Sequence, residues 1–317
     1  MRWLCAAMLV GCYAPSPTSG LPCSSGGDCP AGQSCDLDRH LCLPLAVDAA
    51  GDIIGDGPTD SFVVDPGAPW AAPQPMTAVS STAYETDPAL SPDGLELFFS
   101  SDRMGTVGGL DIYRATRAAT SDAFGMPSPV AELQTTADES AAELGPDRLT
   151  IYFRRSNDIY RASRSSVGAT FTNIVKDEGL STAFNDTNPA FSGDSLVAST
   201  TREFSSLDRD LFLFSRATAM GAWSAPQPIN EVNTPSSDSG AALDLRGTAM
   251  VFHSDRPGSL DSSDIYITTR PSTTVPFGSP VAIRELNTTG NESDATLDAS
   301  WKILVMEREG DLYITTR

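Results

Sequence analysis

Residues 84–117, YETDPALSPDGLELFFSSDRMGTVGGLDIYRATR, carry a pattern that recurs through the rest of the chain. Further copies occupy residues 138–164, 185–216, 237–270 and 291–317. Successive copies are 54, 47, 52 and 54 residues apart when aligned on Leu90, Leu144, Phe191, Leu243 and Leu297. Each copy also contains an Asp-apolar-aromatic triplet, at 111–113, 158–160, 210–212, 264–266 and 311–313. This regular spacing indicates one structural unit repeated five times.

Each copy is predicted to form β-strands. Pro92-Asp93-Gly94 has Pro and Gly where a β-turn needs them, and residues 95–101 after it are rich in strand-forming side chains. Residues 111–116 alternate as a strand does, and another short strand is expected between copies, as at 124–130. Four short strands in about fifty residues are typical of a propeller blade. The sequence therefore predicts an all-β fold, a five-bladed β-propeller over residues 70–317.

The two ends of this region are predicted to share a blade. The chain stops just after the third strand of the fifth copy. Residues 70–76, WAAPQPM, closely match residues 223–229, WSAPQPI, which form a fourth-strand segment between two copies. An N-terminal strand that completes the last blade would close the ring and leave no exposed sheet edge.

Short motifs in the copies carry a family resemblance. SPDG at 91–94, SSDR at 100–103, DIY at 111–113 and HSDR at 253–256 resemble the Pro-Asp relatives of the WD repeat found in TolB-type propellers. The second, third and fifth copies depart from the motif: SGDS replaces SPDG at 192–195, and MERE replaces SSDR at 306–309. The resemblance implies the fold and a role in cell-envelope complexes. A fold shared by many activities does not by itself specify one.

The N-terminus predicts export and a lipid anchor. Its sequence, MRWLCAAMLVGCYAPS, has the charge-then-apolar layout of an export signal. Leu9-Val10-Gly11-Cys12 resembles the bacterial lipobox, which implies a signal peptide over residues 1–11 and a lipid on Cys12. Tyr13 stands where inner-membrane retention usually has Asp, so the resemblance implies a lipid-anchored outer-membrane protein, periplasmic or at the cell surface. The signal is short, and the alternative is a mis-assigned start or a buried N-terminal segment.

Residues 12–43 form a Cys-rich segment. It lacks a C-x-x-C pair and has only His40 nearby, so zinc is not expected. In an exported chain its four later cysteines predict two disulfides, with three pairings open: Cys23, Cys29, Cys35 and Cys42. The segment resembles Cys-rich modules of myxobacterial surface lipoproteins, and a spacer role is favoured over binding. Residues 44–69, rich in Asp, Gly, Ala and Pro, are predicted to be a linker.

The charge of the chain restricts its partners. With 41 acidic and 21 basic residues, the formal net charge is −20. Such a surface repels phosphate, so we expect no nucleic-acid partner and no membrane contact except through the lipid. The two histidines, His40 and His253, exclude multi-His metal centres and leave little room for a Ser-His-Asp mechanism. We expect a monomer without a cofactor, calcium being the one candidate.

Acidic residues recur at the start of each predicted innermost strand. Five residues before the aligned position, every copy has an acid: Glu85, Glu139, Asp186, Asp238 and Glu292. Two copies have a second acid three residues before that position, Asp87 and Asp294. If these strands line the central channel, the carboxylates ring one mouth, where they could bind a cation, an amine or a sugar. The alternative is that they cap turns or pair with the Arg of the next motif. Their repetition in every copy favours that structural role.

The function expected from the sequence is non-catalytic binding or scaffolding at the cell envelope, with a propeller face that binds an envelope protein or glycan. Near-regular repeats, the lipobox and the lack of an asymmetric polar cluster favour it. One alternative is a calcium-dependent carbohydrate-binding module that uses the acidic ring. The other is a glycoside hydrolase with paired carboxylates in the channel, for which the candidates are Asp87, Glu139 and Glu292.

Overall fold

A computed structural model of the chain describes residues 33–36, 41–44, 69–193, 197–205, 208–218, 221–260 and 262–317. The chain divides into two compact units, Met1–Val63 and Val64–Arg317. In the first unit, β1 (Gln33–Asp36) and β2 (Leu41–Pro44) pair antiparallel, with Cys35 opposite Cys42 in the backbone register. The predicted signal peptide, Cys12, Cys23, Cys29 and most of the predicted linker lie outside the described residues.

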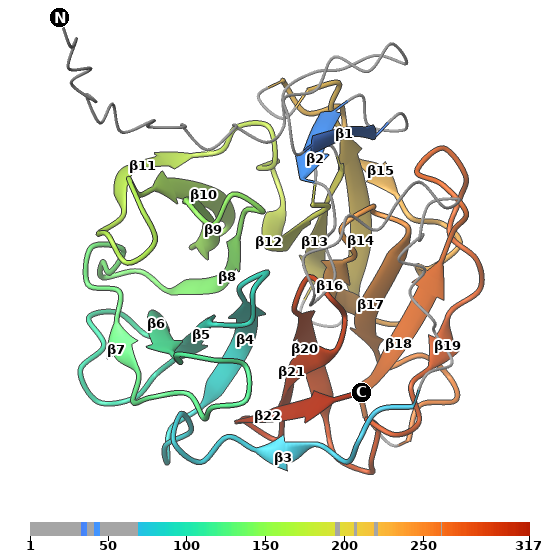
Figure 1. The fold of residues 1–317 in the computed structure, drawn as a ribbon. Helices are drawn as coiled ribbons and strands as arrows, with labels where there is room; N and C mark the ends of the chain where they lie inside the picture. The colour runs from blue at the N-terminus through green and yellow to red at the C-terminus, as the bar shows by residue number, and fades with distance from the viewer. Residues whose placement is uncertain are drawn as a thin grey trace, which may run out of the picture. The chain divides into compact units, whose positions relative to one another are not determined.

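The second unit consists of five four-stranded antiparallel sheets around a central axis (Figure 1). The first blade contains β4 (Glu85–Leu90), β5 (Glu96–Ser101), β6 (Asp111–Thr116) and β7 (Ser128–Pro129). The second contains β8 (Glu139–Leu144), β9 (Thr150–Arg155), β10 (Asp158–Ser163) and β11 (Thr172–Lys176). The third contains β12 (Asn185–Phe191), β13 (Val197–Ser205), β14 (Asp208–Ser215) and β15 (Gln227–Pro228). The predicted all-β, five-bladed propeller is therefore confirmed.

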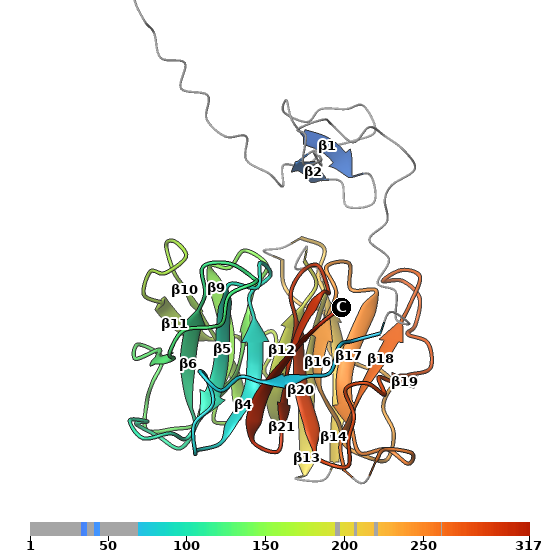
Figure 2. The ribbon, with the colours of Figure 1, turned by 60° about the horizontal axis from the view of Figure 1, so that its bottom comes forward.

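The fourth and fifth blades follow the same plan. The fourth contains β16 (Asp238–Leu243), β17 (Ala249–Ser254), β18 (Asp264–Thr269) and β19 (Val281–Ala282). The fifth contains β20 (Glu292–Leu297), β21 (Ile303–Arg308), β22 (Asp311–Thr316) and, from the other end of the propeller sequence, β3 (Gln74–Pro75). Figure 2 shows the blades from the side, with their strands running roughly along the central axis. Among the described residues, no helix is long and apolar enough to cross a bilayer.

Apolar side chains fill the spaces between neighbouring blades. Phe98 of β5 and Phe153 of β9 are fully buried in one cluster shared by the first two blades. The middle residue of every Asp-apolar-aromatic triplet is also fully buried: Ile112, Ile159, Leu211, Ile265 and Leu312. The repeated triplet is thus a packing device, because its strand presents one apolar side chain to the next blade at the same height in every copy.

A second device joins the third and fourth strands of each blade. The Arg that follows each third strand stacks on an aromatic ring before the fourth, in the pairs Arg117–Phe124, Arg164–Phe171, Arg216–Trp223, Arg270–Phe277 and Arg317–Trp70. The last pair brings the C-terminal residue to 4.5 Å from the Trp70 ring. Nearby, Ala71 N–H donates to the Thr316 carbonyl at 2.9 Å. Packing and hydrogen bonds therefore hold the two ends of the propeller sequence in one blade.

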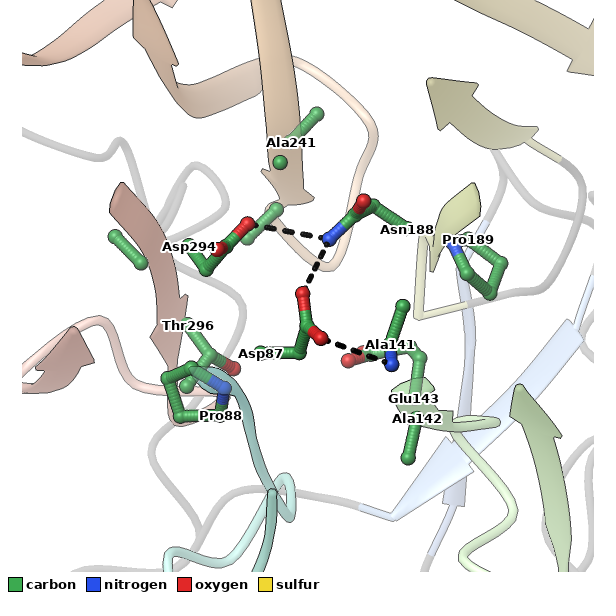
Figure 3. Close-up of a pocket in the computed structure, with 13 residues that line it drawn as sticks. Asp87, Pro88, Ala141, Ala142, Glu143, Asn188, Pro189, Ala241, Asp294 and Thr296 are labelled. Carbon is green, nitrogen blue, oxygen red and sulfur yellow. Dashed lines mark hydrogen bonds between the residues drawn. The ribbon is translucent and has the colours of Figure 1, made fainter. Parts of the chain in front are cut away.

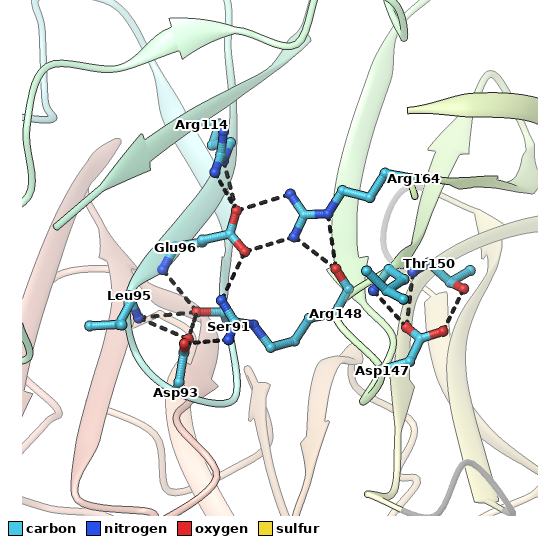
Figure 4. A network of polar contacts seen from close by, with 10 residues as sticks. Ser91, Asp93, Leu95, Glu96, Arg114, Asp147, Arg148, Thr150 and Arg164 are labelled. Carbon is cyan, nitrogen blue, oxygen red and sulfur yellow. Dashed lines mark hydrogen bonds and ion pairs between the residues drawn. The ribbon is translucent and has the colours of Figure 1, made fainter. Parts of the chain in front are cut away.

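An ionic cluster fastens the first blade to the second (Figure 4). Glu96, at the start of β5, accepts two hydrogen bonds from Arg164 of the second repeat, at 3.0 and 2.7 Å. Arg114 and Arg148 also pair with it, at 2.6 and 3.3 Å. Burial opposes the charged form, but the hydrogen bonds and charges of the arginines outweigh it and hold the pKa of Glu96 below its usual range.

Each innermost strand contains a β-bulge at the same place. Pairing with the second strand shifts register there in all five blades. One residue of each bulge has a left-handed backbone, with φ between 46° and 60°: Asp87, Ala141, Asn188, Gly240 and Asp294. That conformation is costly for residues with a Cβ, and a bulge re-aims the side chain that it carries. The bulges form the wall of the central channel and position the candidate site.

Candidate functional site

The five acids that begin the innermost strands are buried inside their own blades. Each is 0% exposed: Glu85, Glu139, Asp186, Asp238 and Glu292. Glu139 is representative, because the Thr135 backbone N–H and hydroxyl both donate to it and Arg155 Nε donates at 2.8 Å. In the other blades the acid likewise accepts from a Ser or Thr four residues earlier and from an arginine. This is the turn-capping and arginine-pairing arrangement given above as the alternative to a binding ring.

The partner arginine comes from either of two sequence positions. In the second, third and fifth blades it lies directly opposite the acid in the register, as Arg155 lies opposite Glu139. In the first and fourth blades a serine takes that place, and Arg103 or Arg256 reaches back from two residues later. Each arginine also stacks on the aromatic residue of its triplet, between 4.1 and 4.9 Å from the ring centre. Acid, arginine and ring form a structural unit in every blade.

Asp87 and Asp294, in contrast, meet in the channel, as Figure 3 shows. Asn188, from the third blade, uses its single amide nitrogen to donate to Asp87 Oδ1 and to Asp294 Oδ1, both at 3.2 Å. Ser100 Oγ and the Ala141 N–H also donate to Asp87, at 3.1 and 3.2 Å. We call Asp87, Asn188 and Asp294 the throat triad, since they lie where the channel narrows.

His253 contacts the triad because Gly240 has no side chain. The Asp294 N–H donates to His253 Nδ1 at 3.0 Å, so that nitrogen is an acceptor and the ring proton lies on Nε2. Burial, followed by the charge of Arg209, lowers the pKa of His253 to about 4, so the ring is neutral at pH 7. A Cβ on Gly240 would lie 2.6 Å from His253 Nδ1 and 2.5 Å from Asp294 Oδ1.

Above the triad, the channel opens into a cavity of about 370 Å³, which we call the mouth cavity. Its volume lies near the lower end of the range for small-molecule sites, ~300–1,000 Å³. Besides the triad and His253, the lining contains the charged groups Arg154, Arg209 and Asp255 and the ring of Tyr84. Hydroxyl and amide groups supply most of its neutral polar atoms: Thr86, Ser140, Thr187, Ser237, Ser239, Ser262, Ser263, Asn291 and Ser293. None of the five blade-internal acids belongs to this lining.

Two positions beside the mouth cavity lose the symmetry of the repeat, whereas the ring of hydroxyl residues keeps it: Thr86, Ser140, Thr187, Ser239 and Ser293. At one second-strand position the copies carry Ser100, Arg154, Thr201, His253 and Glu307. At the bulge they carry two acids, an amide, an alanine and a glycine. The expectation that the chain lacks an asymmetric polar cluster was therefore wrong. The second-strand column could have revealed it, since a structural repeat gives no reason for five different polar groups at one position.

Buried carboxyl groups of the throat hold protons unusually tightly. Burial and then the charge of Asp294 raise the pKa of Asp87 to about 6, and burial also raises the pKa of Asp294. Burial raises the pKa of Glu307 to about 7, against opposing hydrogen bonds from Ser293 and Gly310. Burial, followed by the charge of Glu307, raises the pKa of Tyr84 to about 12, so its hydroxyl remains a donor. The throat therefore carries less negative charge near neutrality than its carboxyl count indicates.

Beyond the triad, the other side of the channel is narrow and lined mainly by small residues. It has a volume of about 30 Å³ and is lined largely by proline and alanine, with Glu143 as its one additional carboxyl group (Figure 3). Burial raises the pKa of Glu143 to about 8. Such a space holds on the order of one or two waters. A small-molecule ligand is therefore expected on the mouth side of the triad.

A metal centre finds no support in the described part of the chain, where no three His, Cys, Asp or Glu side chains are placed to hold an ion together. Asp87 and Asp294 are the only acids of the predicted ring that face each other across the channel, and the amide nitrogen of Asn188 lies between them. An amide nitrogen donates hydrogen bonds and is not a ligand for calcium, which takes oxygen ligands.

Comparison with known proteins identifies the fold. No family model and no curated protein sequence matches the chain. An α-L-arabinofuranosidase from Podospora anserina, solved with cellotriose, aligns with a TM-score of 0.54 at 11% identity over 78% of this chain and 96% of the other. An α-L-arabinofuranosidase from Lactobacillus brevis aligns with a TM-score of 0.50 at 9% identity, covering 74% and 90%.

TolB from Acinetobacter baumannii is also similar, with a TM-score of 0.48 at 12% identity. The alignment covers 75% of this chain and 55% of that TolB chain, so this protein spans just over half of its length. At such low identities, structural likeness identifies the propeller fold and transfers no activity.

Proposed function

We propose that this protein is a non-catalytic binding lipoprotein of the bacterial cell envelope and that its propeller binds a glycan in the mouth cavity. The observation that carries the proposal is the loss of repeat symmetry at that cavity. In all five blades the acid, arginine and aromatic residues keep one structural arrangement, and one hydroxyl per blade lines the mouth. Two other positions differ from blade to blade: the second strand supplies Arg154 and His253 to the lining, and the bulges supply Asp87, Asn188 and Asp294. Differences confined to a cavity are expected where a ligand without five-fold symmetry binds.

The chemistry of the lining favours a sugar over an apolar ligand. Serine, threonine and asparagine side chains supply both donors and acceptors around the cavity, matching the hydroxyl groups of a saccharide. Tyr84 is 46% exposed at the edge, so one aromatic side chain can contact the apolar C–H face of a sugar ring while its hydroxyl donates. Small-molecule sites commonly combine such a surface with a few fixed polar groups.

The carboxyl groups favour binding over cleavage. A glycosidase places two carboxyl groups on either side of the scissile bond, ~5–9.5 Å apart. Asp87 and Asp294 instead share the nitrogen of Asn188, 3.2 Å from each, so a sugar linkage between them would have to displace that amide. The other hydrolase candidates, Glu139 and Glu292, are 0% exposed and paired with arginines. This arrangement supports the non-catalytic proposal over the glycoside hydrolase alternative.

The lipoprotein part of the proposal comes from the sequence. The lipobox-like Leu9-Val10-Gly11-Cys12, followed by Tyr13, supports a lipid on Cys12 and an outer-membrane location. The Cys-rich segment and the linker would then act as a spacer between the anchor and the propeller. A net charge of −20 supports a soluble propeller away from anionic lipid.

Thermal melting tests the binding proposal. The purified protein is melted alone, with millimolar calcium, and with a panel of soluble envelope glycans and peptidoglycan fragments. A ligand that binds only the folded protein raises the Tm. We expect a glycan to do so, with the shift reduced in Tyr84→Ala and unchanged in Met126→Ala, a matched loss of an exposed side chain outside the cavity. A shift with calcium alone, or none with any glycan, would contradict the proposal.

A further inference from the structure

The throat triad places two carboxyl groups together, with the Asn188 amide as the group that bridges them. The basic group of His253 lies close to the pair, with Nδ1 3.6 Å from Asp294 Oδ1. His253 is an acceptor at the nitrogen that faces Asp294, and it is neutral. Buried carboxylates are normally paired with a cation or hold a proton.

Other charged groups act on the triad or share its cavity, which is also lined by Arg154, Arg209 and Asp255. Arg209, next to the start of β14, lowers the pKa of Asp294 by its charge, and Glu307 of β21 interacts unfavourably with both acids. The net result is still an upward shift for Asp87 and for Asp294. With the pKa of Asp87 raised to about 6, the triad gains a proton as the pH falls below neutrality, and a bound cation would compete with that proton.

We infer that the floor of the mouth cavity binds the protonated primary amine of its ligand, so that the glycan carries a free amino sugar rather than only N-acetylated ones. This inference rests on the proposed function and specifies its ligand. An ammonium group has three donors and no acceptor, and it would face two carboxyl groups that mainly accept. The hydroxyl-rich walls above the floor would bind the rest of the sugar.

The shape of the throat also favours an amine. Asp87 and Asp294 already bind one N–H donor group, the Asn188 amide, which occupies the space between them. An ammonium group approaching from the mouth side meets the same two acceptors beside that amide. A bare metal ion would need several oxygen ligands, and the described residues provide no such cluster.

Isothermal titration of the whole protein tests the inference with glucosamine oligomers and N-acetylglucosamine oligomers of equal length. We expect the amine oligomer to bind at least tenfold more tightly at pH 7. Below pH 6 its affinity should fall by up to about tenfold per pH unit, because one proton must leave the throat. At that pH, the measured binding enthalpy should also change with the ionisation enthalpy of the buffer, because the buffer takes up the released proton.

Two variants on different blades locate the amine. Asp87→Asn and Asp294→Asn should each lower the affinity for the glucosamine oligomer by tenfold or more. The affinity for the N-acetylglucosamine oligomer should not change, and melting checks that both variants fold. Equal binding of the two oligomers, or no effect of either variant, would overturn the inference while leaving glycan binding intact. Binding of neither oligomer but of a lysine-containing peptide would overturn the proposed glycan as well.

Discussion

Glu292 and Asp294 are two residues apart on β20, yet neutralising them should have opposite consequences. Glu292 is fully buried and accepts from Arg308 Nε at 2.8 Å and from Thr288 N–H at 2.9 Å. Removing one partner of a buried ion pair costs about 3–5 kcal/mol because the other charge is left unpaired. The Arg308 side chain is 16% exposed and keeps some solvent. We therefore expect Glu292→Gln to cost about 3 kcal/mol, the lower end of that range.

Asp294→Asn should leave stability nearly unchanged at pH 7. Because its pKa is raised in the folded protein, the charged carboxylate is a cost that grows as the pH rises above the value for the unfolded chain, and an amide removes that cost. The amide oxygen can still accept from Asn188, but as a neutral acceptor it does so more weakly, which offsets part of this gain by roughly 1 kcal/mol.

Urea unfolding at pH 7 measures both variants, with the m-value as a check on two-state behaviour. Binding of the ligand identified by melting is measured in parallel. Glu292→Gln should lower the unfolding free energy and leave affinity unchanged. Asp294→Asn should leave the unfolding free energy nearly unchanged and weaken binding. Similar destabilisation by both, or weakened binding in Glu292→Gln alone, would refute the assignment of one acid to structure and the other to the site.

Three further substitutions test other parts of the account. Trp70→Ala should cost about 3–5 kcal/mol in urea unfolding, because Trp70 is buried and stacked under Arg317; a loss below about 1 kcal/mol would refute its part in holding the two ends together. Gly240→Ala should weaken binding at least tenfold, since its Cβ would displace His253 or Asp294, whereas Gly168→Ala, also at positive φ but with open space around it, should not. Cys12→Ser should move the protein from the membrane to the soluble fraction, and persistent membrane attachment would contradict the lipid anchor.

The sequence was sufficient for the blades because each copy repeats its packing residues. The buried Ile112 and its equivalents could be located by spacing alone. The ring acids were also visible, but their orientation was not. In a regular strand Glu85 and Asp87 share a face. The bulge, with φ of 49° at Asp87, changes that alternation, so Glu85 points into its blade and Asp87 into the channel.

Contacts between copies were beyond sequence reasoning. Asn188 reaches the throat from the third blade to bridge acids of the first and fifth, and nothing in its local sequence indicates those partners. The pairing of Glu96 with Arg164 likewise joins residues 68 positions apart. Such contacts depend on how the blades are arranged around the axis, whereas the repeat pattern reports only what each blade contains.

The most direct test of the central claim is a crystal structure of the protein with a bound glucosamine oligomer. The account predicts the sugar in the mouth cavity, with its amine within hydrogen-bond distance, about 3 Å, of both Asp87 and Asp294 and its ring near Tyr84. A sugar bound on the outer surface of the blades, or on the Glu143 side of the throat, would contradict it. A mouth cavity that stays empty at saturating oligomer would contradict it equally.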